Sequence, residues 1–207
     1  MKKFIFAALA FALTITSVES KAQAFQDGDI IISAGYGANT LGRQILKAIE
    51  QEGADIDLTG HNPIFGKFEY AISDKWGIGV NFFASNIGFK QAYNYETYDA
   101  QTNTTTVSRY EDSYSYKVNA LNLRFNRHWE VTDEFDIYFG FGGGTKWGKL
   151  EYKSNNPDRI EGESISPIPM AMELTMGARY YFTDNIGIYS EIGIARSFFQ
   201  GGLAVKF

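Results

Sequence analysis

The stretch "SDKWGIG", residues 73 to 79, returns in outline twice along the chain, as "TDEFDIY" at 132 to 138 and "TDNIGIY" at 183 to 189. Each copy begins with a hydroxyl residue and an aspartate, which can hydrogen-bond the local backbone and so favour a tight turn. Each copy ends in an alternating apolar run, which is the period of two that a β-strand requires. The three copies therefore predict three short hairpin turns of one kind.

The N-terminus predicts export from the cytoplasm. A pair of lysines precedes an apolar run from Phe4 to Val18, and Ala22-Gln23-Ala24 supplies the small residues of a signal-peptidase site. We therefore expect a signal peptide over residues 1–24 and one mature domain over residues 25–207.

Composition narrows the class of protein. The chain has no cysteine, which excludes thiol catalysis and thiolate metal sites. Its formal net charge of -5 disfavours nucleic acid as a partner. The 13 tyrosines, 17 phenylalanines and 21 glycines indicate a β protein, either in water or in lipid.

Eight strand candidates flank the turns and the ends of the mature domain. In an up-and-down barrel with both termini on one side, eight strands give three turns on that side, which is the number of repeats found. The candidates are residues 30–37, 64–72, 76–85, 116–129, 135–147, 168–182, 186–196 and 202–207.

The connections at the opposite end are expected to be long, polar and irregular. They cover residues 38–62, 87–115 and 148–167, with a helix from Leu41 to Gln51 in the first, whereas the last connection, near residues 198–201, is short. Long loops at one end and short turns at the other are typical of outer-membrane barrels, in which the short turns are periplasmic.

Alternation within the strands separates two faces but does not say which face meets solvent. In "ALNLRFN", residues 120 to 126, the apolar side chains share one face and Asn122, Arg124 and Asn126 share the other. A water-soluble sandwich would bury the apolar face, and a membrane barrel would expose it. Aromatic residues beside the turns favour the barrel, because an interfacial girdle belongs there. They are Trp76, Trp129, Phe135, Tyr181 and Phe182.

With its signal peptide, turn repeats, alternation and terminal Phe207, the sequence resembles the small outer-membrane β-barrel proteins of Gram-negative bacteria, the OmpA- and OmpX-like porin-family barrels. The resemblance implies an all-β fold, an eight-stranded antiparallel up-and-down transmembrane β-barrel, surrounded by outer-membrane lipid and lipopolysaccharide. It also implies that Leu203, Val205 and Phe207 form a C-terminal signal that the barrel assembly machinery reads.

The face opposite Leu121 carries a balanced set of charges. An eight-stranded barrel is just wide enough for side chains to fill, so we expect these charges to pair across a closed lumen. Counting from the turns predicts one layer of Glu69, Asp136, Arg179 and Lys206, and a second layer of Lys67, Arg124, Glu173 and Glu191.

These features predict a non-enzymatic protein with a structural, surface-binding or adhesion role, and without a cofactor or metal. The segment from Tyr93 to Lys117 holds six tyrosines, so the loop at 87–115 is a candidate for an extracellular ligand, or else a twisted hairpin that extends beyond the bilayer. The alternatives are a narrow pore or carrier for small or apolar solutes, and a lipid A-modifying enzyme that uses His61. His128 is expected to be structural.

Overall fold

The computed structural model describes residues 23–38, 40–51, 55–165, 169–194 and 197–207, so most of the expected signal peptide lies outside the described residues. Among the described residues, no helix is long and apolar enough to span a membrane. The elements are β1 (Ile30–Ala38), α2 (Leu41–Gln51), β2 (Ile56–Ser73), β3 (Trp76–Asp99), β4 (Thr104–Thr132), β5 (Phe135–Ser154), β6 (Gly162–Ile165), β7 (Met170–Tyr181), β8 (Ile186–Ile194) and β9 (Phe199–Lys206).

The repeated sequence motif forms the three short turns. Two residues connect β2 to β3 and β4 to β5, and four connect β7 to β8. The leading hydroxyl of each motif accepts a hydrogen bond from a backbone N–H of the turn, which stabilises the reversal. These bonds join Trp76 N to Ser73 Oγ (3.2 Å), Glu134 N to Thr132 Oγ1 (3.3 Å) and Ile186 N to Thr183 Oγ1 (2.9 Å).

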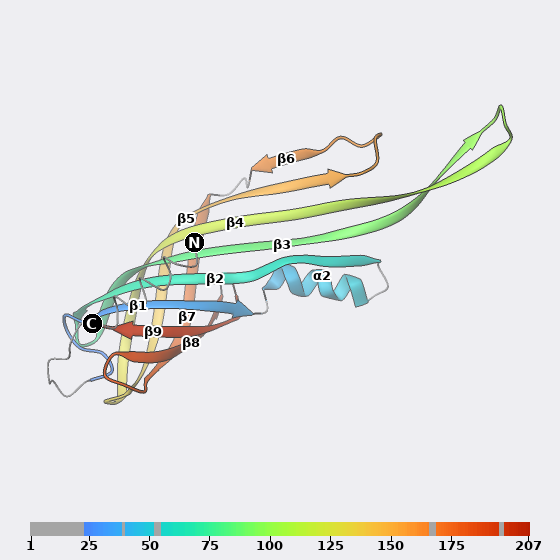
Figure 1. The fold of residues 1–207 in the computed structure, drawn as a ribbon. Helices are drawn as coiled ribbons and strands as arrows, with labels where there is room; N and C mark the ends of the chain where they lie inside the picture. Colours follow the sequence, from blue (N-terminus) through green and yellow to red (C-terminus); the bar gives the residue numbers. More distant parts are fainter. Residues whose placement is uncertain (1–22, 39, 52–54, 166–168, 195–196) are drawn as a thin grey trace, which may run out of the picture.

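Eight antiparallel strands close into a ring (Figure 1). Each strand pairs with the next along the chain, except that β5 pairs with β7, and β1 closes the ring on β9. In β1, Ile32 lies opposite Phe68 of β2 on one side and opposite Val205 of β9 on the other. The prediction of an eight-stranded antiparallel up-and-down barrel is confirmed, and β6 is an additional short strand beside β5, outside the ring.

The apolar face of the barrel points outward. Leu121 is 45% exposed and Met172 is 74% exposed, whereas Arg124 is 3% exposed and Glu173 is 6% exposed. A protein folded in water would have the reverse arrangement, because exposed apolar area costs free energy and buried charge costs more. The barrel therefore spans a membrane, and lipid meets the face that carries Leu121.

Two tryptophans mark the turn end of this apolar surface. Trp76 and Trp129 are exposed, and the Arg127 guanidinium lies 5.2 Å and 5.7 Å from their ring centroids. Aromatic rings with a snorkelling cation between them are typical of a membrane interface. Tyr181, which we expected in this girdle, is instead buried inside the barrel, because strand alternation puts Tyr180 on the outer face.

The expectation of irregular long connections is wrong for residues 87–115. β3 and β4 continue as a paired hairpin up to Asp99 opposite Thr104, far beyond the other strands (Figure 1). Its tyrosines and threonines favour extended backbone, and cross-strand pairing satisfies the hydrogen bonds without a core. The segment therefore forms a twisted hairpin, and an extracellular ligand on it stays a prediction.

The two other long connections also contain more strand than expected. Residues 56–61 of β2 pair with β3, and the end of β5 pairs with β6 through Glu151 opposite Glu163. The expected helix from Leu41 to Gln51 is present as α2. Polar composition was a poor guide to irregular structure at this end, because strands outside the bilayer need no apolar face.

Candidate functional site

The lumen holds the charged residues between two apolar clusters. Near the turns lie Phe25, Ile31, Ala71 and Ala204, and toward the hairpin lie Phe65, Phe83, Val118, Ala120 and Ala171. Charged groups between such clusters are shielded from water at both ends, so each needs a partner within the lumen.

Glu191 is the centre of the layer nearer the hairpin. Arg124 donates to both of its carboxylate oxygens, at 2.9 Å and 3.1 Å, and Lys67 Nζ lies 2.7 Å from Oε1. Tyr138 adds a hydroxyl donor at 2.8 Å. Glu173 lies 3.8 Å from Arg124, so the four residues expected in this layer do come together.

Glu69 and His128 form the centre of the layer nearer the turns. Arg179 Nη2 lies 2.8 Å from Glu69 Oε2, and His128 Nε2 lies 2.9 Å from Glu69 Oε1. The other ring nitrogen of His128 lies 2.5 Å from Asp136. His128 therefore bridges two carboxylates that would otherwise face each other.

Lys206, expected in the same layer, sits apart from the others. Its ammonium lies 3.9 Å from Asp29, which directly precedes β1. It holds the segment before β1 against the barrel wall rather than bridging the lumen.

Several neutral side chains of the network were not selected from the sequence. Asn81 and Asn122 donate to Glu173 at 2.7 Å and 3.0 Å, and Thr175 accepts from Arg124 at 2.8 Å. The signal that could have identified them is alternation: Asn122 and Asn126 share a face with Arg124 and, two residues further along, His128. Counting charged residues does not find these side chains because they are neutral.

Little free volume remains among the charged residues of the lumen. The cavity among the charged residues measures about 10 Å³, which is roughly the space of one water molecule. A Cβ added at Gly177 would clash with the Tyr138 ring, so glycine there makes room for the aromatic side chain. The interior is a packed core of ion pairs and hydrogen bonds.

The N-terminal segment closes the turn end. Phe25 is 1% exposed, and its ring lies 3.6 Å from the His128 ring at an interplanar angle of 7°. Gly28 N donates to the carbonyl of Ala71, and Asp27 N donates to Asp74 Oδ1. These contacts fix Phe25 over the bridging histidine.

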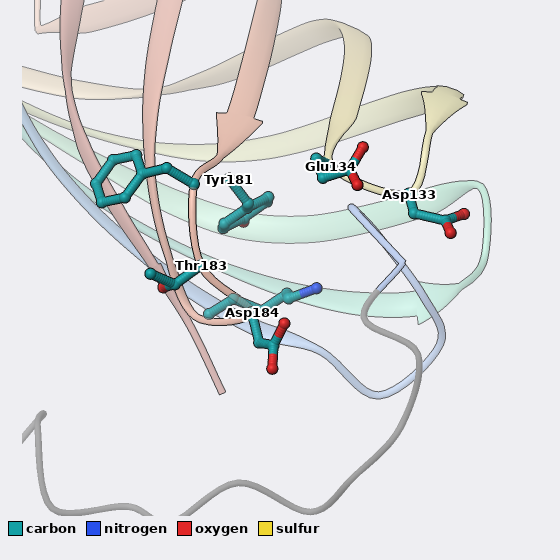
Figure 2. A pocket seen from close by; sticks show the side chains of 7 residues that line it. Asp133, Glu134, Tyr181, Thr183 and Asp184 are labelled. Atoms are coloured by element: carbon teal, nitrogen blue, oxygen red, sulfur yellow. The ribbon is translucent and has the colours of Figure 1, made fainter.

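A recess of about 370 Å³ opens between two turns at this end (Figure 2). Asp133 and Glu134 come from one turn, and Thr183 and Asp184 come from another. The remaining lining residues are Tyr181, Phe182 and Lys206. Within the described ranges, no group of three or more carboxylate or histidine side chains is arranged to hold a metal ion.

The C-terminal strand alternates across the barrel wall. Leu203 is 56% exposed, whereas Ala204 and Lys206 are buried on the lumen side. Val205 and Phe207 share the outer side with Leu203. Phe207 exchanges two backbone hydrogen bonds with Ile30, at 2.9 Å and 3.1 Å, and so belongs to the seam that closes the ring.

His61, the residue considered for lipid A chemistry, lies on β2 at the hairpin end. Its side chain is exposed, and its Nδ1 lies 2.8 Å from the carbonyl oxygen of Asn62. Asp57, on the same strand, lies opposite Lys90 in the strand pairing.

The projecting hairpin is the second candidate site. Beyond the barrel, β3, β4 and β5 form a sheet whose two sides differ in chemistry. One side carries ion pairs, Lys90 with Glu111 at 2.7 Å and Lys117 with Glu151 at 3.0 Å. The hydrogen bond from Lys117 lowers the pKa of the Glu151 carboxyl. The other side carries aromatic rings.

No family model and no curated protein matches this sequence. Solved structures of similar fold include the attachment invasion locus protein of Yersinia pestis in complex with the heparin analogue sucrose octasulfate. It is 12% identical to this chain, the match covers 87% of this chain and 99% of that chain, and the TM-score is 0.46. The N-terminal β-barrel domain of Pseudomonas aeruginosa OprF has 12% identity, 88% and 98% coverage and a TM-score of 0.43. The outer membrane protein OprG from Pseudomonas aeruginosa has 12% identity, 89% and 98% coverage and a TM-score of 0.39.

Proposed function

We propose that this protein is a non-enzymatic barrel of the bacterial outer membrane that presents the β3–β4 hairpin to the cell exterior as a binding element. The observation that carries the proposal is the combination of a closed, lipid-facing barrel with a paired hairpin that continues far beyond it. The barrel anchors the hairpin to the membrane. Because side chains fill the lumen, the hairpin is the part of the protein that can bind a partner.

The proposed orientation places the short turns in the periplasm and the hairpin outside. Short periplasmic turns and long extracellular extensions are the rule in bacterial outer-membrane barrels. The same proposal includes export through a signal peptide over residues 1–24. It also includes insertion by the assembly machinery, which would read Leu203, Val205 and Phe207. Lipopolysaccharide would then surround the outer half of the barrel.

The chain has no cysteine, so single cysteines report orientation cleanly. A membrane-impermeant maleimide added to intact cells should label Thr102→Cys at the hairpin tip and leave Glu134→Cys at a turn unlabelled. Both variants should react after the cells are lysed, which is the matched control. Labelling of Glu134→Cys alone in intact cells, or recovery of the protein in the soluble periplasmic fraction, would overturn the proposal.

A further inference from the structure

Aromatic side chains gather on one side of the projecting sheet. Strands β3, β4 and β5 pair there without a register shift, so residues opposite one another share a side: Phe89 lies opposite Tyr114, and Tyr114 lies opposite Tyr152. The rings on this side, called the aromatic face below, are Phe89, Tyr93, Tyr95, Tyr110, Tyr114 and Tyr152.

The rings form two neighbouring groups on this side of the sheet. The Tyr114 ring centroid lies 4.9 Å from that of Phe89 and 4.9 Å from that of Tyr152. Further out, the Tyr110 ring lies 6.1 Å from Tyr93 and 6.2 Å from Tyr95. Three strands thus supply rings side by side, with hydroxyls beside them.

The segment after β5 folds back and contacts the aromatic face. The Arg159 guanidinium lies 5.3 Å from the Tyr93 ring centroid, and Asn156 donates to the Tyr93 hydroxyl at 3.2 Å. Asp112 lies 3.4 Å from Arg159 and accepts from Ser154 at 2.6 Å. Because Arg159 and Asp112 offset each other, the aromatic face carries little net charge.

We infer that the aromatic face binds a neutral carbohydrate, an inference that rests on the proposed exposure of the hairpin outside the cell. The faces of aromatic rings are electron-rich and attract the polarised C–H groups of a sugar ring. Tyrosine hydroxyls beside them can hydrogen-bond sugar hydroxyls. The Tyr93 ring, which Asn156 and Arg159 already hold in place, loses little conformational freedom on binding.

Charge decides between sugar classes. A sulfated or phosphorylated glycan needs free cations, and the arginine at the aromatic face is already paired with Asp112. Three of the lysines on the opposite side, Lys90, Lys117 and Lys149, are paired with glutamates as well. An extended peptide would instead seek backbone groups at a strand edge, which the rings do not provide.

The test uses the purified full-length barrel in an amine-oxide detergent, because glycoside detergents would compete for the site. Calorimetric titration with cellohexaose, chitohexaose and maltohexaose should detect binding of at least one. Tyr93→Leu and Tyr114→Leu should each weaken that binding at least tenfold, and Tyr114→Phe should restore it to within threefold. Tyr98→Leu, on the opposite side of β3, should leave it unchanged. Retained heat-shifted gel mobility identifies the folded variants.

The inference is wrong if none of the three hexaoses binds. It is also wrong if Tyr93→Leu and Tyr114→Leu leave the affinity for the bound hexaose unchanged. Tighter binding of sucrose octasulfate or of an extended peptide would also overturn it. Labelling of Thr102→Cys on intact cells distinguishes failure of the carbohydrate inference from failure of the proposed function. If the cysteine reacts but no sugar binds, the carbohydrate class is wrong and the surface role stands. If the cysteine does not react, the proposed function itself fails.

Discussion

Arg124 of β4 reaches across the lumen to Glu191 of β8 and holds it with two hydrogen bonds, of 2.9 Å and 3.1 Å. The two strands are not neighbours in the ring, so this fork joins opposite parts of the barrel wall. Paired hydrogen bonds between a guanidinium and a carboxylate are stronger and more directional than a single charged contact.

Removing Arg124 should therefore destabilise the barrel. Arg124→Ala leaves Glu191 and Glu173 with one fewer cation in a dry interior, and the free energy of unfolding should fall by about 3 kcal/mol. Urea unfolding in lipid vesicles, followed by tryptophan fluorescence, measures the loss. Arg109→Ala, on the exposed hairpin, is the matched control. Equal midpoints for the two variants would contradict the assigned role of the fork.

The lumen should not conduct ions. Its charges are paired, and the cavity among them measures about 10 Å³, too small for a hydrated ion. The protein in planar bilayers should show no stable current steps. Reproducible steps that Arg124→Ala or Glu173→Ala abolishes would instead support the pore or carrier alternative.

Phe25 should contribute to stability from outside the ring of strands. Its buried ring covers His128, so Phe25→Ala exposes the bridging histidine and should lower the free energy of unfolding by about 3 kcal/mol. Phe198→Ala, where the side chain is half exposed, should cost far less. Comparable urea midpoints for these two variants would show that the N-terminal segment does not hold the turn end closed.

The outer face should tolerate charge only away from lipid. Leu123 and Val107 are 49% and 58% exposed, but Leu123 lies mid-way along the apolar belt and Val107 lies on the hairpin. Leu123→Arg should destabilise the folded barrel in vesicles by about 3 kcal/mol, and Val107→Arg should have little effect. If both variants unfold at the wild-type urea concentration, the belt is not in lipid.

The C-terminal strand should matter for assembly more than an ordinary girdle residue does. If the assembly machinery reads Leu203, Val205 and Phe207, then Phe207→Ala should lower the amount of inserted barrel in cells well below that of Phe135→Ala. Quantifying the heat-shifted band in outer-membrane fractions measures this. Equal amounts of the two variants would leave Phe207 as a seam residue without a role in recognition.

The sequence by itself determined which residues share a side of each strand. The hydroxyl-aspartate motif located the three turns, and the period of two grouped Arg124 with Asn122 and separated both from Leu121. Counting back from the turns even placed Lys67 and Glu191 in one layer. These are local properties, since a turn and a strand period depend on near neighbours along the chain.

Only the tertiary structure decided what each side faces. Alternation is the same for a sandwich in water and a barrel in lipid, and ring closure resolves the choice by burying Arg124 and exposing Leu121. Closure also brings His128 between Glu69 and Asp136 and sets Phe25 over it, contacts that join residues from four separate segments. The long hairpin likewise becomes visible only in the pairing of β3 with β4, because paired backbones can stabilise polar strands that sequence composition describes as loop.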